Sequence, residues 1–201
     1  MAAAFDRTAL LDAFDQIGRA AVEAGAKLQI AVYGGSALML ASNFRFSTED
    51  VDVSELPKPL PAWLAGTLEK IARRNGWSDD WFNDGVVFHL SPFADQAADH
   101  LEFGSFPRDG GSPGLVVSVP SAEYLLALKL KAVRIADPVR GDAERLDILN
   151  LMRVVGISTP ERSSCAAWKV FSGQRGVCRE AAFLLKHMSA HGAADAPKYP
   201  G

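Results

Sequence analysis

The sequence has little cysteine, no long apolar run and almost no net charge, and each of these features excludes a class of protein. Its two cysteines, Cys165 and Cys178, lack CxxC spacing, so we predict no disulfide and a reducing compartment. No apolar run approaches the roughly 20 residues that cross a bilayer, and the first residues lack a basic secretory segment. With 21 basic and 24 acidic side chains, the net charge of −3 excludes a globally basic nucleic-acid binder but allows a local basic surface. We therefore expect a soluble cytoplasmic protein that does not contact a membrane.

Helical and strand patterns alternate along the first 120 residues, and the pattern then becomes helical. A chain of 201 residues can hold one good core, or a core with a small helical appendage. We predict an α/β or α+β fold in which helices flank a mixed sheet. The core spans residues 1–120, a helical part spans 121–191, and a disordered tail spans 192–201. The predicted elements are a helix capped by Asp6 and ended by Gly25, a helix over 63–74 ended by Gly76, strands over 85–90, 101–103 and 115–119, a helix capped by Ser121, and a helical segment after Pro160.

The densest group of chemically capable residues begins at a glycine pair. Residues 30–33 have the pattern of a buried strand, Gly34 and Gly35 follow it, and Ser36 opens a short helical segment over 37–41. Because glycine has no Cβ, backbone amides can approach a ligand closely here, and a helix N-terminus favours an anion such as phosphate. The Ser36 hydroxyl could add a further contact. This turn predicts a phosphate-binding site.

Two carboxylates follow shortly after the glycine pair. In the run Asp50-Val51-Asp52-Val53, strand alternation directs both carboxylates to one face and both valines to the other. Carboxylate oxygens are ligands for hard cations such as Mg²⁺ or Mn²⁺, which bridge to phosphate oxygens in phosphoryl-transfer sites. Taken alone, a Gly-Gly-Ser turn or an Asp-x-Asp strand end is commonplace. Their order and spacing together predict a site that binds both phosphate and metal.

The two motifs resemble the signature of the nucleotidyltransferase superfamily. The closest match is to AbiEii-like nucleotidyltransferases, many of which are toxins of toxin–antitoxin pairs. The first matching block is GGSALML at residues 34–40, followed by Arg45, Thr48, Asp50 and Asp52, with Arg45 three residues before Thr48 where two is usual. The second block runs from Tyr124 to Arg134 and continues into a helical Asp-containing element at residues 144–151. The resemblance implies a nucleotidyltransferase-like mixed sheet and a magnesium-dependent transfer of a nucleoside monophosphate.

Further site residues follow from this resemblance. Lys129 and Arg134 would contact the triphosphate, although a surface lysine lying along apolar neighbours is the structural alternative for Lys129. The family usually carries a third metal-binding carboxylate on a later strand, and Glu102 is the choice here, with Asp84 and Asp99 as the substitutes. Arg134 and Asp147 could instead form a surface ion pair. His89, within a predicted strand, is more typical of a structural histidine.

The resemblance also implies an RNA acceptor, such as tRNA, and an antitoxin partner. The segment 162–191 carries five basic side chains and one acidic one, which favours RNA. A small-molecule acceptor, as in antibiotic-inactivating relatives, is the nearest alternative. A protein that keeps the fold and binds a nucleotide or a partner without transfer is the alternative from another class, and lack of a usable third carboxylate would favour it.

Overall fold

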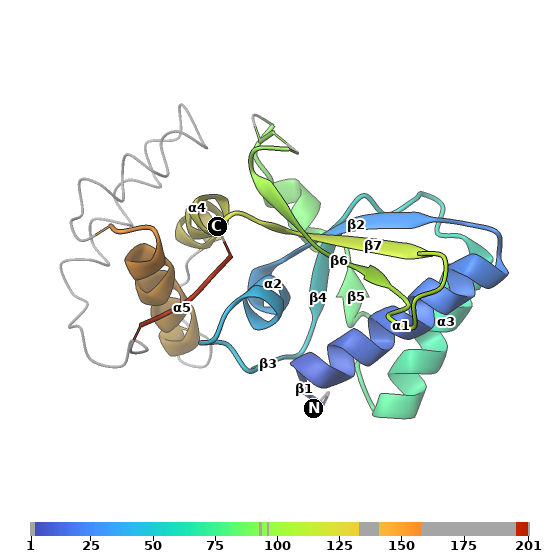
Figure 1. The fold of residues 1–201 in the computed structure, drawn as a ribbon. Helices are drawn as coiled ribbons and strands as arrows, with labels where there is room; N and C mark the ends of the chain where they lie inside the picture. Colours follow the sequence, from blue (N-terminus) through green and yellow to red (C-terminus); the bar gives the residue numbers. More distant parts are fainter. Residues whose placement is uncertain (1–2, 93, 96, 133–140, 158–195, 201) are drawn as a thin grey trace. The chain divides into compact units, whose positions relative to one another are not determined.

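The computed structural model describes residues 3–92, 94–95, 97–132, 141–157 and 196–200 (Figure 1). These residues form two compact units. Unit 1 consists of Met1–Ala41, Phe46–Phe88 and Glu102–Val119, and unit 2 consists of Ser42–Arg45, His89–Leu101 and Pro120–Gly201. The segment 162–191, the helical segment expected after Pro160, and Arg134 lie outside the described residues.

Unit 1 is built on a five-stranded mixed sheet with the order β5-β4-β2-β7-β6. Neighbouring strands β2 and β4 are antiparallel, whereas β2 and β7, and likewise β4 and β5, are parallel. A second, two-stranded sheet pairs β1 with β3. With the five α-helices of the described part, this confirms the predicted mixed α/β architecture. The strands are β1 (Phe5–Asp6), β2 (Leu28–Tyr33), β3 (Ser47–Thr48), β4 (Val51–Ser54), β5 (Phe82–Asn83), β6 (His100–Phe106) and β7 (Leu115–Pro120).

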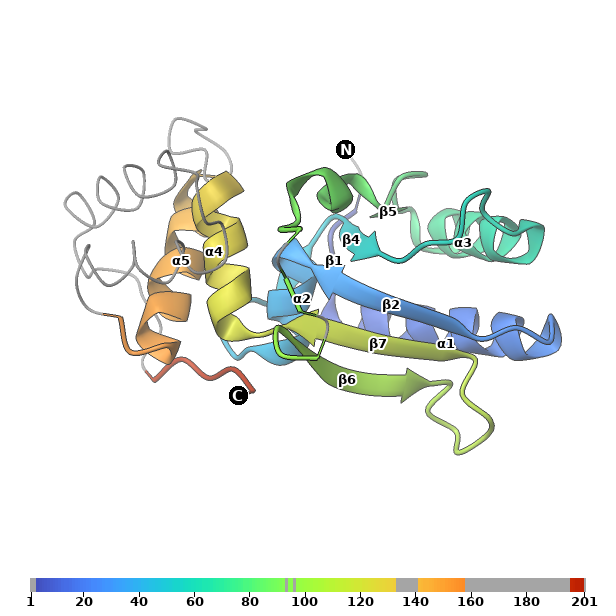
Figure 2. The same ribbon diagram turned by 90° about the horizontal axis from the view of Figure 1, so that it is seen from above.

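The two faces of the five-stranded sheet differ in chemistry. Directly paired residues lie on the same face, and alternate residues along a strand share a face. One face carries apolar side chains that are all buried: Leu28, Ile30, Val32, Val51, Val53, Phe82, Leu115 and Val117. Helices α1 (Arg7–Glu23) and α3 (Ala62–Asn75) lie side by side along one face of this sheet (Figures 1 and 2). The opposite face carries Gln29, Ala31, Tyr33, Asp52, Ser54, Asn83, Val116 and Ser118.

Local sequence signals account for the ends of both long helices. The Asp6 side chain accepts a hydrogen bond from the Ala9 amide at 2.9 Å, which confirms the predicted N-cap of α1. Gly76 ends α3 in the left-handed conformation at φ +68°, as predicted. The strands predicted over 101–103 and 115–119 are also confirmed, as parts of β6 and β7.

The strand predicted over residues 85–90 is wrong. A 3₁₀ helix, η1, spans Gly85–His89 instead. Its apolar sequence has a strand pattern, but the Asn83 side chain accepts a hydrogen bond from the Gly85 amide at 2.9 Å and turns the chain. The Val87 amide then donates to the Asp84 carbonyl at 3.1 Å. As a result the apolar side chains are not paired in the sheet, and Phe88 is 86% exposed.

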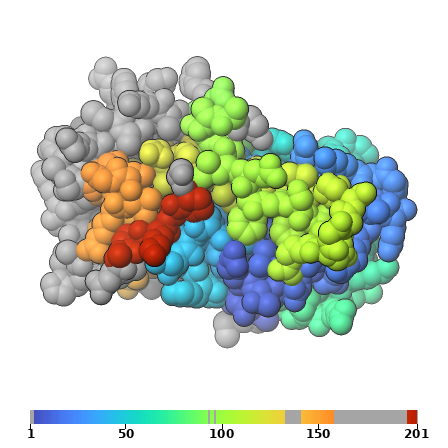
Figure 3. Space-filling model, viewed as in Figure 1, coloured from blue at the N-terminus to red at the C-terminus, as the bar shows by residue number. Residues whose placement is uncertain are grey.

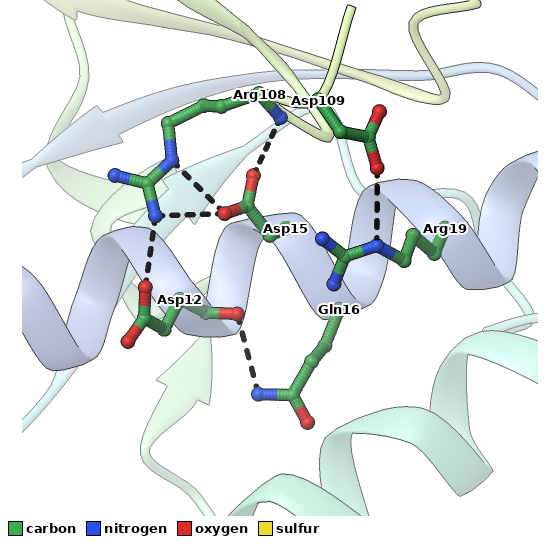
Figure 4. A network of polar contacts seen from close by, with 6 residues as sticks. All are labelled: Asp12, Asp15, Gln16, Arg19, Arg108 and Asp109. Atoms are coloured by element: carbon green, nitrogen blue, oxygen red, sulfur yellow. Dashed lines mark hydrogen bonds and ion pairs between the residues drawn. The ribbon is translucent and has the colours of Figure 1, made fainter. Parts of the chain in front are cut away.

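Helix α1 is fixed to the turn between β6 and β7 by a charged network (Figure 4). Arg108 donates from Nε and Nη2 to the Asp15 carboxylate, at 2.9 and 2.7 Å, and from Nη2 to Asp12 at 2.8 Å. Arg19 pairs with Asp109 at 3.3 Å. Figure 3 shows this turn at the surface against α1. Burial alone would raise the pKa of Asp15, but the hydrogen bonds and charge of Arg108 outweigh it, so that the pKa is lowered from 3.8.

Unit 2 contains helices α4 (Ala122–Ala132) and α5 (Gly141–Val154), which pack against each other. The Ser121 hydroxyl accepts a hydrogen bond from the Tyr124 amide at 3.2 Å, so the predicted cap of α4 is confirmed. Near the chain end, the Tyr199 hydroxyl donates to the Pro120 carbonyl at 2.7 Å, and burial raises the pKa of Tyr199. Within the described residues, every helix is too short or too polar to cross a membrane.

Candidate active site

The glycine turn and one of the two carboxylates meet at the end of β2. Strand β2 runs directly into helix α2 (Gly34–Ala41), and the β2–β4 register pairs Tyr33 with Asp52. Gly34 has φ +65°, and a Cβ built on it would lie 2.8 Å from Oδ2 of Asp52. Glycine is therefore required here both by the backbone conformation and by the adjacent carboxylate. The structure brings Gly34 and Asp52 together although 17 residues lie between them in the sequence.

Asp50 precedes β4 and is fixed mainly through its backbone. Its carbonyl accepts hydrogen bonds from the Ser36 hydroxyl at 2.8 Å and from the Thr48 hydroxyl at 3.2 Å. Thr48 Oγ1 also lies 3.3 Å from Oδ1 of Asp50. Ser36 is 1% exposed, so its hydroxyl joins α2 to the segment before β4 instead of facing outward to a ligand. The half-buried carboxylate of Asp50 thus projects from a well-held backbone.

Glu102 lies on a distant strand of the same sheet. It belongs to β6, which β7 and β2 separate from β4. With a strand spacing of 4.7–4.9 Å, this places Glu102 about 14 Å from the β4 strand across the sheet. Its side chain is exposed. The structure therefore does not bring Glu102 to Asp50 and Asp52.

The two substitutes for Glu102 have partners of their own. Asp84 forms an ion pair with Lys58 at 2.5 Å, and Asp99 Oδ2 accepts a hydrogen bond from the Asp95 amide at 2.7 Å. Among the described residues, no group of three or more His, Cys, Asp or Glu side chains is arranged to hold a metal ion. Asp50, just before β4, and Asp52, on β4, remain the carboxylates that the sequence predicts as cation ligands in unit 1.

Asn83 is a neighbour of Asp52 that the sequence did not reveal. Strand β5 pairs with β4 in parallel, and Asn83 is the direct partner of Asp52 on the same sheet face. A strand of two residues is too short to show a periodic pattern, so β5 could not be predicted. The signal available was an apolar pair, Trp81-Phe82, followed by the turn-forming sequence Asn-Asp-Gly.

A second charged cluster lies in unit 2. Lys129 Nζ lies 2.9 Å from Oδ2 of Asp147, and Arg45 Nη1 lies 3.4 Å from the same oxygen. The Asp147 side chain is 3% exposed, and its two partners are 15% and 27% exposed. Lys129 is therefore a partly buried, paired cation and not a surface lysine lying along apolar neighbours. Asp147 is thus a buried carboxylate with two cationic partners.

Comparison with protein-family models, with curated proteins and with solved structures finds no match to this chain.

Proposed function

We propose that the protein is a metal-dependent nucleotidyltransferase that moves a nucleoside monophosphate from a nucleoside triphosphate to an RNA acceptor such as tRNA. The proposal follows the resemblance to AbiEii-like nucleotidyltransferases and therefore includes an antitoxin protein as a partner. The observation that carries it is the closeness of Gly34 to the carboxylate of Asp52, since a Cβ on Gly34 would lie 2.8 Å from Oδ2. A phosphate-binding turn and a cation-binding carboxylate are useful to one reaction only when they are adjacent, as these are.

The arrangement around Gly34 supports a role in binding phosphate. The first amides of a helix have no intrahelical acceptor, and those of α2 follow Tyr33 without an intervening loop. Gly34 and Gly35 have no side chains, so none stands in front of these amides. Preorganised amides stabilise developing negative charge without the cost of reorganisation. They would orient the phosphates for transfer.

The donor set suits a magnesium or manganese ion. Asp50 and Asp52 supply hard, negatively charged oxygens, and Gly34 has no side chain to occupy the space beside Oδ2 of Asp52. A bound ion would supply charge neutralisation at the phosphates. Thr48 and Ser36 act through the Asp50 backbone, because their hydroxyls hold its carbonyl in place.

Lys129 in unit 2 belongs to the same proposal. It is expected to contact the triphosphate, and its pairing with buried Asp147 holds the ammonium in one position. Arg45 adds a second cation to the same carboxylate.

A second candidate function has one observation in its favour. Within the described part of the chain, Asp50 and Asp52 have no third acidic or histidine partner for a metal ion. This favours a protein that binds a nucleotide without transferring it. A small-molecule acceptor is the alternative within the transferase class.

Product analysis separates these functions. The protein is incubated with Mg²⁺, each of the four α-labelled nucleoside triphosphates, and either total tRNA or a panel of small hydroxylated acceptors. Label on RNA with release of pyrophosphate is expected. Label on a small molecule would identify the other acceptor class, and triphosphate binding without label on any acceptor would identify the binding protein.

Matched variants tie the activity to the site. Asp52→Asn and Asp50→Asn each remove one charge with little change of shape, and each is expected to lower transfer at least 100-fold, by analogy with removal of one charge-stabilising group. Asp79→Asn makes the same change at an exposed turn position and should leave transfer unchanged. Full activity in both site variants would refute the proposal.

A further inference from the structure

Asn83 is held in a defined orientation beside Asp52. Its Oδ1 accepts a hydrogen bond from the Gly85 amide at 2.9 Å, which distinguishes the oxygen end of the amide from the nitrogen end. Nδ2 lies 3.4 Å from the Asp80 carbonyl, a long contact that engages one of its two hydrogens. The second hydrogen has no partner among the described residues, and the side chain is half-buried. Asn83 therefore keeps a donor available.

The register places Asn83 next to Asp52. Asn83 and Asp52 are direct partners on parallel strands, so their side chains leave the same sheet face about 5 Å apart. On the other side of Asp52, the register places Tyr33, whose strand leads into Gly34. Asp52 is thus flanked by the start of α2 on one side and by the amide of Asn83 on the other.

The chemistry of this arrangement favours an anion bound next to the carboxylates. Asp50 and Asp52 repel a phosphate unless a cation lies between them, and even then the outer phosphate oxygens require donors. Backbone amides of the glycines at α2 can donate to phosphate oxygens on one side of Asp52. The neutral side-chain amide on β5 can donate on the other side without adding negative charge, which a carboxylate at that position would do.

We infer that Asn83 is a further ligand-binding residue of this site, whose Nδ2–H donates to a phosphate oxygen of the nucleotide held beside Asp52. The inference rests on the proposed function, because it takes a nucleoside triphosphate as the ligand. It adds a residue on β5 that touches the substrate, and it explains why an amide follows Phe82 where a third carboxylate could have stood.

The test compares two substitutions of Asn83 with a matched control. Asn83→Asp keeps an oxygen that can accept from the Gly85 amide but removes the donor, and Asn83→Ala removes the donor without adding charge. Gln29→Glu makes the same amide-to-carboxylate change on the same sheet face, four residues before Tyr33 along β2. Equilibrium binding of Mg·ATP, Mg·GTP, Mg·CTP and Mg·UTP is measured by calorimetry, with thermal melting of each unliganded variant alongside.

Asn83→Asp is expected to raise the Kd for the bound triphosphate at least 10-fold, since a hydrogen bond to a charged group is lost. Asn83→Ala should raise it several-fold, and Gln29→Glu should leave it within about 2-fold, as expected for a polar substitution away from the ligand. Unliganded Asn83→Asp should melt slightly below the wild type, because it places a like charge directly opposite Asp52, and this shift is the reference for the binding result. Calorimetry with Mg²⁺ alone shows whether a cation contact is involved.

Three results would overturn the inference. Wild-type affinity in Asn83→Ala would mean that only added charge matters, and wild-type affinity in Asn83→Asp would mean that Asn83 only shapes the turn. Tighter binding of Mg²⁺ by Asn83→Asp with unchanged triphosphate affinity would place Asn83 against the cation. A wild-type protein that binds triphosphates without transfer refutes the transferase alone, whereas one that binds none refutes both.

Discussion

Replacing Gly34 by alanine tests whether the glycine turn and Asp52 are in contact. At φ +65° an alanine costs about 1–2 kcal/mol more than glycine, whatever its surroundings. The new Cβ would also lie 2.8 Å from Oδ2 of Asp52, and such overpacking adds about 1 kcal/mol when a short side chain can move aside. Gly34→Ala should therefore destabilise unit 1 by about 2–3 kcal/mol.

Gly25 is the matched control for this substitution. It has φ +64°, and its Cβ would meet no atom within 4 Å, so Gly25→Ala carries only the backbone cost. The double substitution Gly34→Ala with Asp52→Ala should be about 1 kcal/mol less destabilised than the two single effects added together, because the contact is gone.

Urea unfolding followed by tryptophan fluorescence measures these differences in unit 1. Trp63, Trp77 and Trp81 all lie in that unit, and a Trp168→Phe background removes the fourth tryptophan, which lies outside the described residues. If Gly34→Ala costs no more than Gly25→Ala, and costs the same with and without Asp52, then the carboxylate does not lie against the turn, and the central observation for the site is lost.

Three further predictions concern stability. The pKa of Asp15 is lowered, so its pairing with Arg108 stabilises the fold fully above pH 3.8, and this contribution is lost as the pH falls through the folded pKa. The melting temperature of Arg108→Gln, measured between about pH 6 and pH 2, should therefore depend less on pH than that of the wild type. Gly18→Ala should lower the free energy of unfolding in urea by at least about 2 kcal/mol, because its Cβ would lie 2.5 Å from backbone atoms of β6. In the control Gly66→Ala the Cβ meets no atom within 4 Å, so this change should be neutral or stabilise α3 by about 0.5–1 kcal/mol. Asp147→Asn should lower the stability of unit 2 by up to about 3 kcal/mol, because it removes the buried carboxylate that pairs with partly buried Lys129. Equal melting of variant and wild type would contradict this.

The sequence predicted those parts of the fold that local rules control. The Asp6 and Ser121 caps, the Gly76 terminus and the β2–α2 junction follow from residue chemistry over a few positions, and all are present. The helix α2 nevertheless begins at Gly34, two residues before the predicted start at Ser36.

Strand order could not be predicted, because it depends on contacts between distant segments. Leu101-Glu102-Phe103 correctly indicated a strand, but nothing in these residues shows that β7 and β2 lie between it and β4. For the same reason the neighbour of Asp52 on β5 was missed. The strand expected over 85–90 failed for a local reason, since the Asn83 side chain competes for the Gly85 amide and starts a turn.

The difference between the two faces of the sheet has a consequence for how the site can vary. A shift of β4 by one residue relative to β2 would turn Asp52 into the hydrophobic core and move Val51 and Val53, both now 0% exposed, to the opposite face. Burying an unpaired carboxylate costs several kcal/mol, so such misalignment is strongly disfavoured. The burial of Val51 and Val53, which do not contact a ligand, therefore fixes the sheet face on which the Asp52 carboxylate lies. Mutational tolerance should accordingly be lower at these valines than at exposed positions nearer to the site.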